Sequence, residues 1–194
     1  LFGRMVAGDG GLGPIDLLLG GPGDQHEATI ASLGETGALL VASSGAGDAH
    51  DVVALLIDST GRPLDDWSVV NEQGDDRGPV LATLGGGASA LVTWTRGGDL
   101  WCATVDVSTK SVGQPFAVAQ VDAPGSVHVT GAHPSYAIAH AVDAHSTALV
   151  RVDVEGDAPR VQTITQRPGS PLGVAFHDVP GVVTLATTVS YTHL

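Results

Sequence analysis

The chain has 194 residues, and its 8 Lys and Arg against 21 Asp and Glu give a formal net charge of −13. This charge repels the phosphates of nucleic acids and anionic lipids, so neither is expected as a partner. No apolar run approaches the roughly 20 residues of a spanning helix, so insertion into a membrane is not expected. The single cysteine, Cys102, excludes an internal disulfide.

Short strands separated by turns are predicted along the whole chain, which indicates an all-β fold. The chain has 27 Gly and only 4% aromatic residues, and its apolar runs are rich in β-branched residues, which favour strands. The predicted strands are 1–7, 15–19, 28–33, 38–44, 52–58, 67–72, 79–84, 89–95, 100–106, 115–120, 126–131, 136–143, 147–153, 160–166, 172–176 and 182–189.

Groups of four strands recur, with equivalent positions about 45 to 51 residues apart, a period within the range of propeller blades. Trp67 and Phe116 match at the start of a fourth strand. Prolines recur just before that strand, where an outer edge tolerates the missing N–H; these are Pro14, Pro115 and Pro159. The repeats predict a half blade, three blades and a half blade, at 1–24, 25–73, 74–121, 122–167 and 168–194.

Several runs, such as 52–57, are apolar at consecutive positions, which indicates sheets that are buried on both faces. The layout resembles a degenerate β-propeller of the kind found in secreted or surface-exposed bacterial proteins. The resemblance is one of layout only, because no WD, Kelch, integrin-type or sialidase motif is present. It implies a single propeller domain of four-stranded antiparallel blades, as a partial or small ring and a fragment of a longer protein. A β-sandwich and a β-solenoid are the rival folds.

In a propeller, the links between repeats and the loops from the second to the third strand share one face. That face would collect the Asp-x-His triplets at 24/26, 48/50 and 143/145. Carboxylate and imidazole together can bind a divalent cation or perform acid–base chemistry. The alternative is that these residues are ordinary turn formers in solvated loops. If a ligand site exists, we expect it at Asp24, His26, Asp48, His50, Asp75, Asp76 and Asp99.

Two smaller sets of residues have their own alternatives. His128 and His140 are predicted on adjacent strands, where they could form a two-histidine site, although hydrogen-bonded core histidines are the simpler interpretation. Four aromatic residues, Trp67, Trp94, Trp101 and Phe116, could stack on a sugar, but their positions within strands favour core packing.

No motif for nucleophilic catalysis or phosphate binding is present. We therefore expect a non-catalytic module of a secreted or cell-surface protein that presents loops to a protein or glycan, with a divalent cation as the one cofactor these residues would suit. The alternative is a glycoside hydrolase or lyase with acidic residues at the central channel. Two carboxylates about 5 to 10 Å apart in a cleft would favour the enzyme, and acids scattered around a rim would favour binding. A purely architectural role is the third hypothesis.

Overall fold

The computed structural model describes residues 1–6, 8–20, 23–71, 74–84, 87–121, 127–132, 135–154, 159–169, 171–176 and 183–187. Within these ranges the regular structure is β-strand, apart from one 3-10 turn at Gly34–Thr36. The predicted all-β fold is therefore confirmed. Parts of the predicted strands at 1–7, 67–72, 126–131 and 182–189 lie outside the described residues.

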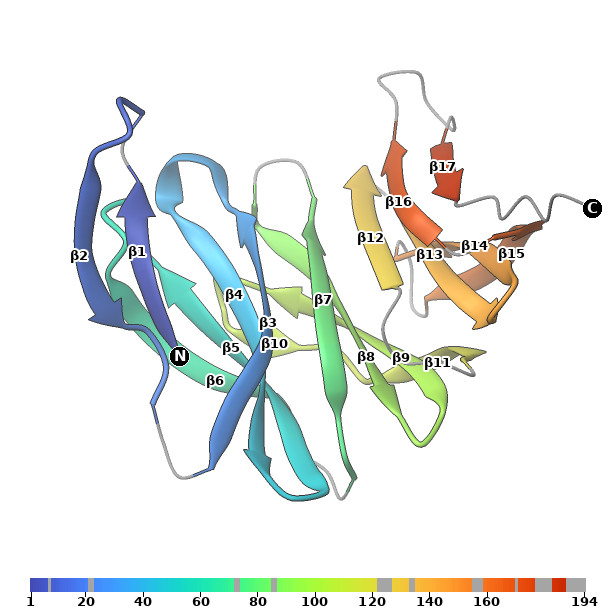
Figure 1. The fold of residues 1–194 in the computed structure, drawn as a ribbon, viewed down its shortest axis with the longest axis horizontal. Helices are drawn as coiled ribbons and strands as arrows, with labels where there is room; N and C mark the ends of the chain where they lie inside the picture. Colours follow the sequence, from blue (N-terminus) through green and yellow to red (C-terminus); the bar gives the residue numbers. More distant parts are fainter. Residues whose placement is uncertain are drawn as a thin grey trace, which may run out of the picture.

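The strands form five antiparallel sheets that follow one another along the chain (Figure 1). Sheet 1 contains β1 (Phe2–Val6) and β2 (Leu12–Leu17), and sheet 5 contains β16 (Pro171–Phe176) and β17 (Val183–Thr187). Sheet 2 is the four-stranded meander β3 (Asp24–Ser32), β4 (Ala38–Ala46), β5 (Ala49–Ile57) and β6 (Pro63–Val70). Sheet 4 repeats it with β12 (Val127–Ala132), β13 (Ser135–Asp143), β14 (Ser146–Asp153) and β15 (Arg160–Pro168).

Sheet 3 has the same order but a divided outer strand. It contains β7 (Arg77–Thr83), β8 (Ser89–Arg96), β9 (Asp99–Asp106), β10 (Ser111–Val112) and β11 (Phe116–Gln120). Both β10 and β11 pair with β9. The sequence therefore predicted one outer strand at 115–120 where the chain forms two short ones.

The expected burial of both sheet faces is observed. In β4, Leu39 and Val41 enter the core between sheets 2 and 3, whereas Leu40 and Ala42 pack beneath sheet 1. The alternation of side chains along a strand sends neighbours to opposite faces, so a run that is apolar at every position fills two cores. Cys102 is one such core residue, because it lies fully buried between sheets 3 and 4.

The sheets lie face to face in a row, and their first strands, β3, β7, β12 and β16, contact one another in that order (Figure 1). Sheets 1 and 5 lie at opposite ends of the row. Burial is greatest in the middle strands, such as β4, β8 and β13, and low in the outer strands, since β15 is exposed over most of its length. The starts of β3 and β7 therefore lie next to each other at one end of adjacent sheets.

Among the strands that begin earlier than the sequence predicted, β3 and β6 differ most, by four residues each. We expected β3 from residue 28, but it starts at Asp24, and we expected β6 from residue 67, but it starts at Pro63. Both added segments are polar and partly exposed, so they carry no apolar run. The predicted site residues Asp24 and His26 consequently belong to a strand and not to a loop.

Candidate functional site

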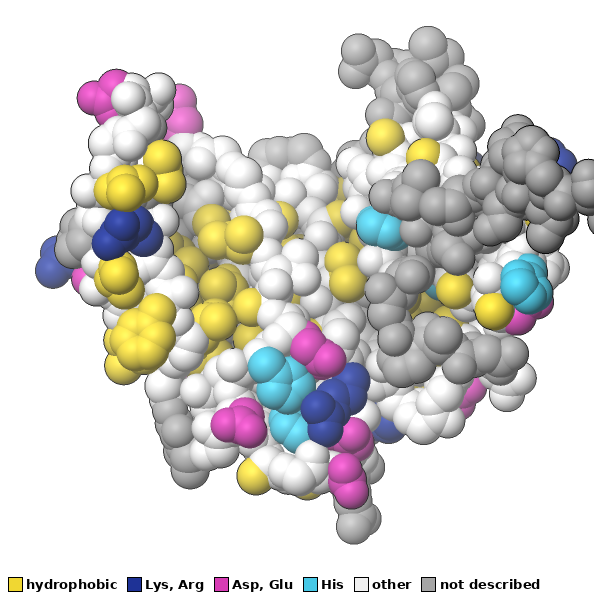
Figure 2. Space-filling model, viewed as in Figure 1, with side chains coloured by type: hydrophobic (Ala, Val, Ile, Leu, Met, Phe, Trp, Pro, Cys, Tyr) yellow, Lys and Arg dark blue, Asp and Glu magenta, His cyan; other side chains and the backbone are white. Residues whose placement is uncertain are grey.

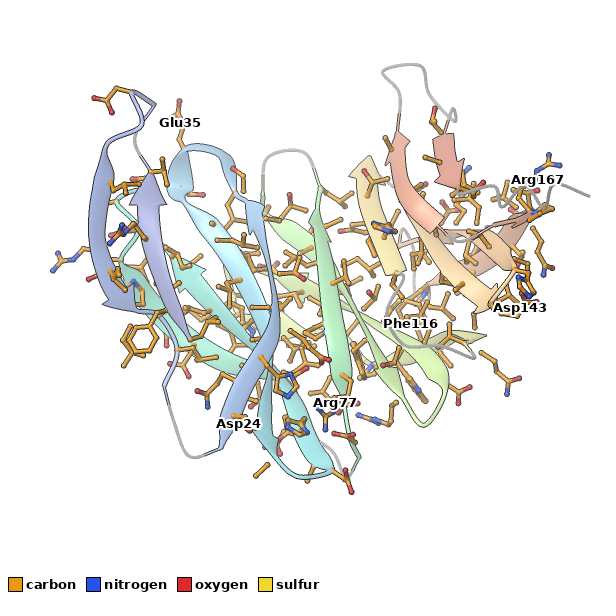
Figure 3. The ribbon with its side chains drawn as sticks, viewed as in Figure 1. Asp24, Glu35, Arg77, Phe116, Asp143 and Arg167 are labelled. Carbon is orange, nitrogen blue, oxygen red and sulfur yellow. The ribbon has the colours of Figure 1, made fainter. Side chains whose placement is uncertain are left out.

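The predicted ligand residues separate into a group that the fold brings together and a group that it does not. His26, His50, Asp75 and Asp76 gather where β3, β5 and β7 meet. Figure 2 shows histidine, acidic and basic side chains side by side on this part of the surface. Asp48 lies exposed in the β4–β5 turn, and the remaining two residues lie at the starts of strands. These are Asp24, exposed and opposite Gly45 (Figure 3), and Asp99, opposite Arg96.

The centre of the gathered group is a chain of contacts from His50 through Asp75 to Arg77. His50 is 3% exposed, and its Nδ1 lies 2.7 Å from Oδ1 of Asp75. Arg77 donates from Nε to both oxygens of that carboxylate, at 2.9 and 3.0 Å. Burial acts to raise the pKa of Asp75, but the hydrogen bonds from His50 and Arg77 and the charge of Arg77 outweigh it, so the pKa is lowered. Asp75 is thus held as a carboxylate by internal partners.

The far end of Arg77 ties this chain of contacts to sheet 2. Its Nη2 donates to the carbonyl oxygen of Gly47 at 2.9 Å, and its Nη1 lies 3.2 Å from Nε2 of His26. The rings of His26 and His50 are tilted against each other, with centroids 4.9 Å apart. One guanidinium therefore joins the start of β7 to β3 and to the β4–β5 turn. We call His26, Glu27, His50, Asp75 and Arg77 the polar junction.

Glu27 completes the junction from an unusual backbone conformation. It is one of two non-glycine residues with positive φ (53°) among those described, and the register of β3 against β4 shifts at this point. Its Oε2 accepts from the backbone N–H of Gly78 at 2.7 Å and lies 3.4 Å from Nδ1 of His26. Gly78, 51 residues later, also has a positive φ (58°), within a register shift of β7. Two matching bulges, one in each sheet, therefore meet through the Glu27 side chain.

A second ion pair lies behind the junction. Asp76 is fully buried, and Arg96 donates to its two oxygens from Nε and Nη2, at 2.7 and 2.9 Å. The same guanidinium lies over Trp101, 5.5 Å from the ring centre. Burial, and next the negative charge of Asp76, raise the pKa of the nearby Asp51. Asp76 is therefore part of the structural support and not of an open ligand site.

A groove of about 550 Å³ runs beside the junction along the first strands of sheets 2, 3 and 4. Glu27 and Arg77 line it together with Thr95, Val80 and Val127. Glu27 is 44% exposed and Arg77 31% exposed, so both are accessible from solvent. Of the described residues that line the groove, Glu27 is the only carboxylate, and none is aromatic.

The histidines do not form a metal site in the described part of the chain, where no three His, Cys, Asp or Glu side chains gather around one point. His128 pairs with Ala139, and Val127 pairs with His140. Consecutive positions of a strand point to opposite faces, so the hypothesis of a site shared by His128 and His140 is wrong. His145 is exposed in the β13–β14 turn, and its backbone N–H binds the Asp143 carboxylate, as in an ordinary turn.

The partners of the predicted residues were harder to find from the sequence. Arg77 and Arg96 lie in the same polar segments as the predicted acids, but nothing in the sequence pairs each with its own carboxylate. Nothing in the sequence indicated that the hydroxyl of Ser43 would bind Glu27, or that the carbonyl oxygen of Gly47 would bind Arg77. The aromatic residues behave as core: Trp94 is fully buried, and Trp67 and Trp101 pack against the same cluster.

The comparisons with known proteins add no further assignment, since no family model and no curated protein matches the chain. The described residues contain no helix long and apolar enough to cross a membrane.

Proposed function

We propose that the chain is a non-catalytic β-propeller module of a secreted or cell-surface protein, and that it binds a protein or glycan partner at the groove beside the polar junction. The face-to-face row of sheets, with first strands side by side, supports the propeller arrangement. In that arrangement the groove lies along the central channel.

The observation that supports a binding function is that two of the predicted acidic residues are held in internal ion pairs. Asp75 is neutralised by His50 and Arg77, and Asp76 is neutralised by Arg96. Glycoside hydrolysis needs two carboxyl groups facing a substrate across a cleft. The groove offers Glu27 as its one carboxylate among the described residues, while Asp24 and Asp48 are exposed away from it. Two acids thus serve as internal partners, and two others are exposed outside the groove. This arrangement favours binding over catalysis.

The lining of the groove favours a protein segment over a sugar. Sugar rings are commonly bound on aromatic side chains, and none lines the described part of the groove. The groove instead combines apolar positions, such as Val80 and Val127, with one acidic and one basic side chain. Such a mixture suits an extended peptide segment that carries both apolar and charged residues.

The proposal can be tested with a random peptide library and an oligosaccharide array, both probed with the labelled chain. We expect peptides to be retained by the wild type and lost by Val80→Arg, which places a large charged side chain in the groove. Leu64→Arg is the matched control, because Leu64 is 57% exposed on the outer strand β6. Retention by the groove variant equal to that of the wild type would contradict the proposal.

The same preparation tests the enzyme alternative with a panel of fluorogenic aryl glycosides. We expect no turnover above that of buffer. Turnover that disappears in Glu27→Gln would overturn the non-catalytic assignment and identify the groove as an active site.

A further inference from the structure

His26 lies between an acidic and a basic side chain, and its two ring nitrogens face different partners. Nε2 lies 3.2 Å from Nη1 of Arg77, and Nδ1 lies 3.4 Å from Oε2 of Glu27. A guanidinium can only donate, so Nε2 must accept, and the ring must be neutral with its proton on Nδ1. The observed contacts therefore describe the unprotonated state of His26.

Protonation of His26 would weaken the contact of its ring with Arg77 and strengthen its contact with Glu27. Nε2 would then carry a hydrogen directed at the N–H group of Arg77, with two positive charges in contact. At Nδ1, the contact to Glu27 would become a charge-assisted pair, which is stronger than a neutral one. Protonated His26 therefore keeps Glu27 and repels the end of Arg77.

The other charged groups around His26 determine how far Arg77 can move. From β5, the ring of His50 lies tilted against that of His26, and from the segment before β7, Asp75 holds Nε of Arg77. The Asp76–Arg96 ion pair lies behind this layer. Because the guanidinium is planar and rigid, Nη1 and Nη2 can leave His26 and Gly47 only if the whole group rotates, and the contact of Nε with Asp75 limits how far it moves.

We propose that His26 is a proton-operated switch that positions the Arg77 guanidinium at the groove. Near neutral pH, Arg77 is held against His26 and the β4–β5 turn. When His26 takes up a proton in mildly acidic solution, the guanidinium of Arg77 rotates about its contact with Asp75, leaves His26 and Gly47, and turns toward the groove. The positive charge of Arg77, which already lines the groove, is then no longer held against the β4–β5 turn, and the groove favours an acidic partner segment. The effect on a partner rests on the proposed binding function, whereas the switch itself does not.

The switch can be tested without any ligand by ¹⁵N NMR of the arginine side chains. We expect the protection of the Arg77 Nη protons, relative to free arginine at the same pH, to fall about tenfold between pH 8 and 5, with the midpoint of the His26 ring signal. Tenfold corresponds to about 1.4 kcal/mol, in the range of a charged hydrogen bond. His26→Gln is the critical variant, because its amide oxygen accepts from Arg77 at any pH.

In His26→Gln, Arg77 should remain protected at every pH, whereas His145→Gln, which changes an exposed histidine elsewhere, should behave as the wild type. Unchanged protection in the wild type while His26 titrates would overturn the switch, and so would an equal loss in His26→Gln. If the switch operates and the peptide library is not retained, only the proposed function fails.

Discussion

The interface between sheets 2 and 3 and the interface between sheets 3 and 4 have the same apolar construction, but their described polar residues differ. Both are filled by alternating side chains, with Trp94 in the first and Ile138 in the second. The first ends in the polar junction, where β3 and β7 each carry a register shift. In the second, β12 pairs with β13 without a shift, and the buried His140 has no partner for Nε2 within the described residues.

Within the described residues, sheets 3 and 4 are joined by apolar side chains such as Ile138 and Val150. Sheets 2 and 3 are joined by apolar side chains and also by the polar junction. The junction adds a strained Glu27, several directed hydrogen bonds and accessible charged groups at one interface. Backbone strain is typical of functional sites, and this supports placing the partner there.

Breaking the buried Asp76–Arg96 ion pair should have the largest effect on the stability of the interface between sheets 2 and 3. Arg96→Met leaves the fully buried Asp76 carboxylate without its partner, and such a change typically costs about 3 kcal/mol or more. We expect this loss in urea unfolding, with little dependence on salt because the pair is shielded from solvent.

The double variant Asp76→Asn with Arg96→Met is the control. It removes the uncompensated charge, so it should recover a large part of the lost stability. A single Arg96→Met variant as stable as the wild type would mean that the pair does not support the interface.

The sequence predicted the apolar parts of the fold better than its polar edges. Runs such as 38–44 and 52–58 were placed correctly, because a strand that is buried on both faces has a strong apolar signal. The first residues of β3 carry no such signal, since Asp24 and Glu27 are exposed while their backbone still pairs with β4 or bulges from it.

The candidate site could be predicted only as a region. His50, Asp75 and Asp76 were named because acids and histidines recur at turns, but they serve as internal partners, and Asp48 stays in solvent. The decisive contacts join residues about 51 positions apart, as Glu27 joins Gly78. Such contacts depend on how two sheets pack, and a periodic pattern of apolar residues does not contain that information.

At the interface between sheets 3 and 4, we expect His140 to cause a smaller, pH-dependent change in stability. Burial lowers the pKa of this imidazole in the folded protein, whereas the hydrogen bond to Ala141 acts against the change. The unfolded chain therefore binds the proton more tightly, and stability falls as pH decreases through the ordinary histidine value of about 6.5. His140→Leu should remove this dependence and raise the stability by about 1 kcal/mol at pH 8, since an unpartnered buried nitrogen is lost.

Urea unfolding of both proteins between pH 8 and 5 measures this prediction. A wild type and a His140→Leu variant with parallel stability curves would show that His140 does not titrate with folding. The His26 switch is separate, because it is read from the side chain of Arg77 and not from global stability.

The most direct test of the polar junction is a double-mutant cycle between the two sheets, with His26→Ala and Arg77→Met measured singly and together at pH 8. Contacts that join β3 to β7 predict a coupling free energy of about 1 kcal/mol. Strictly additive effects, with a coupling near zero, would contradict the account: the two sheets would then be joined by their apolar core alone, and the junction would have no part in shaping the groove.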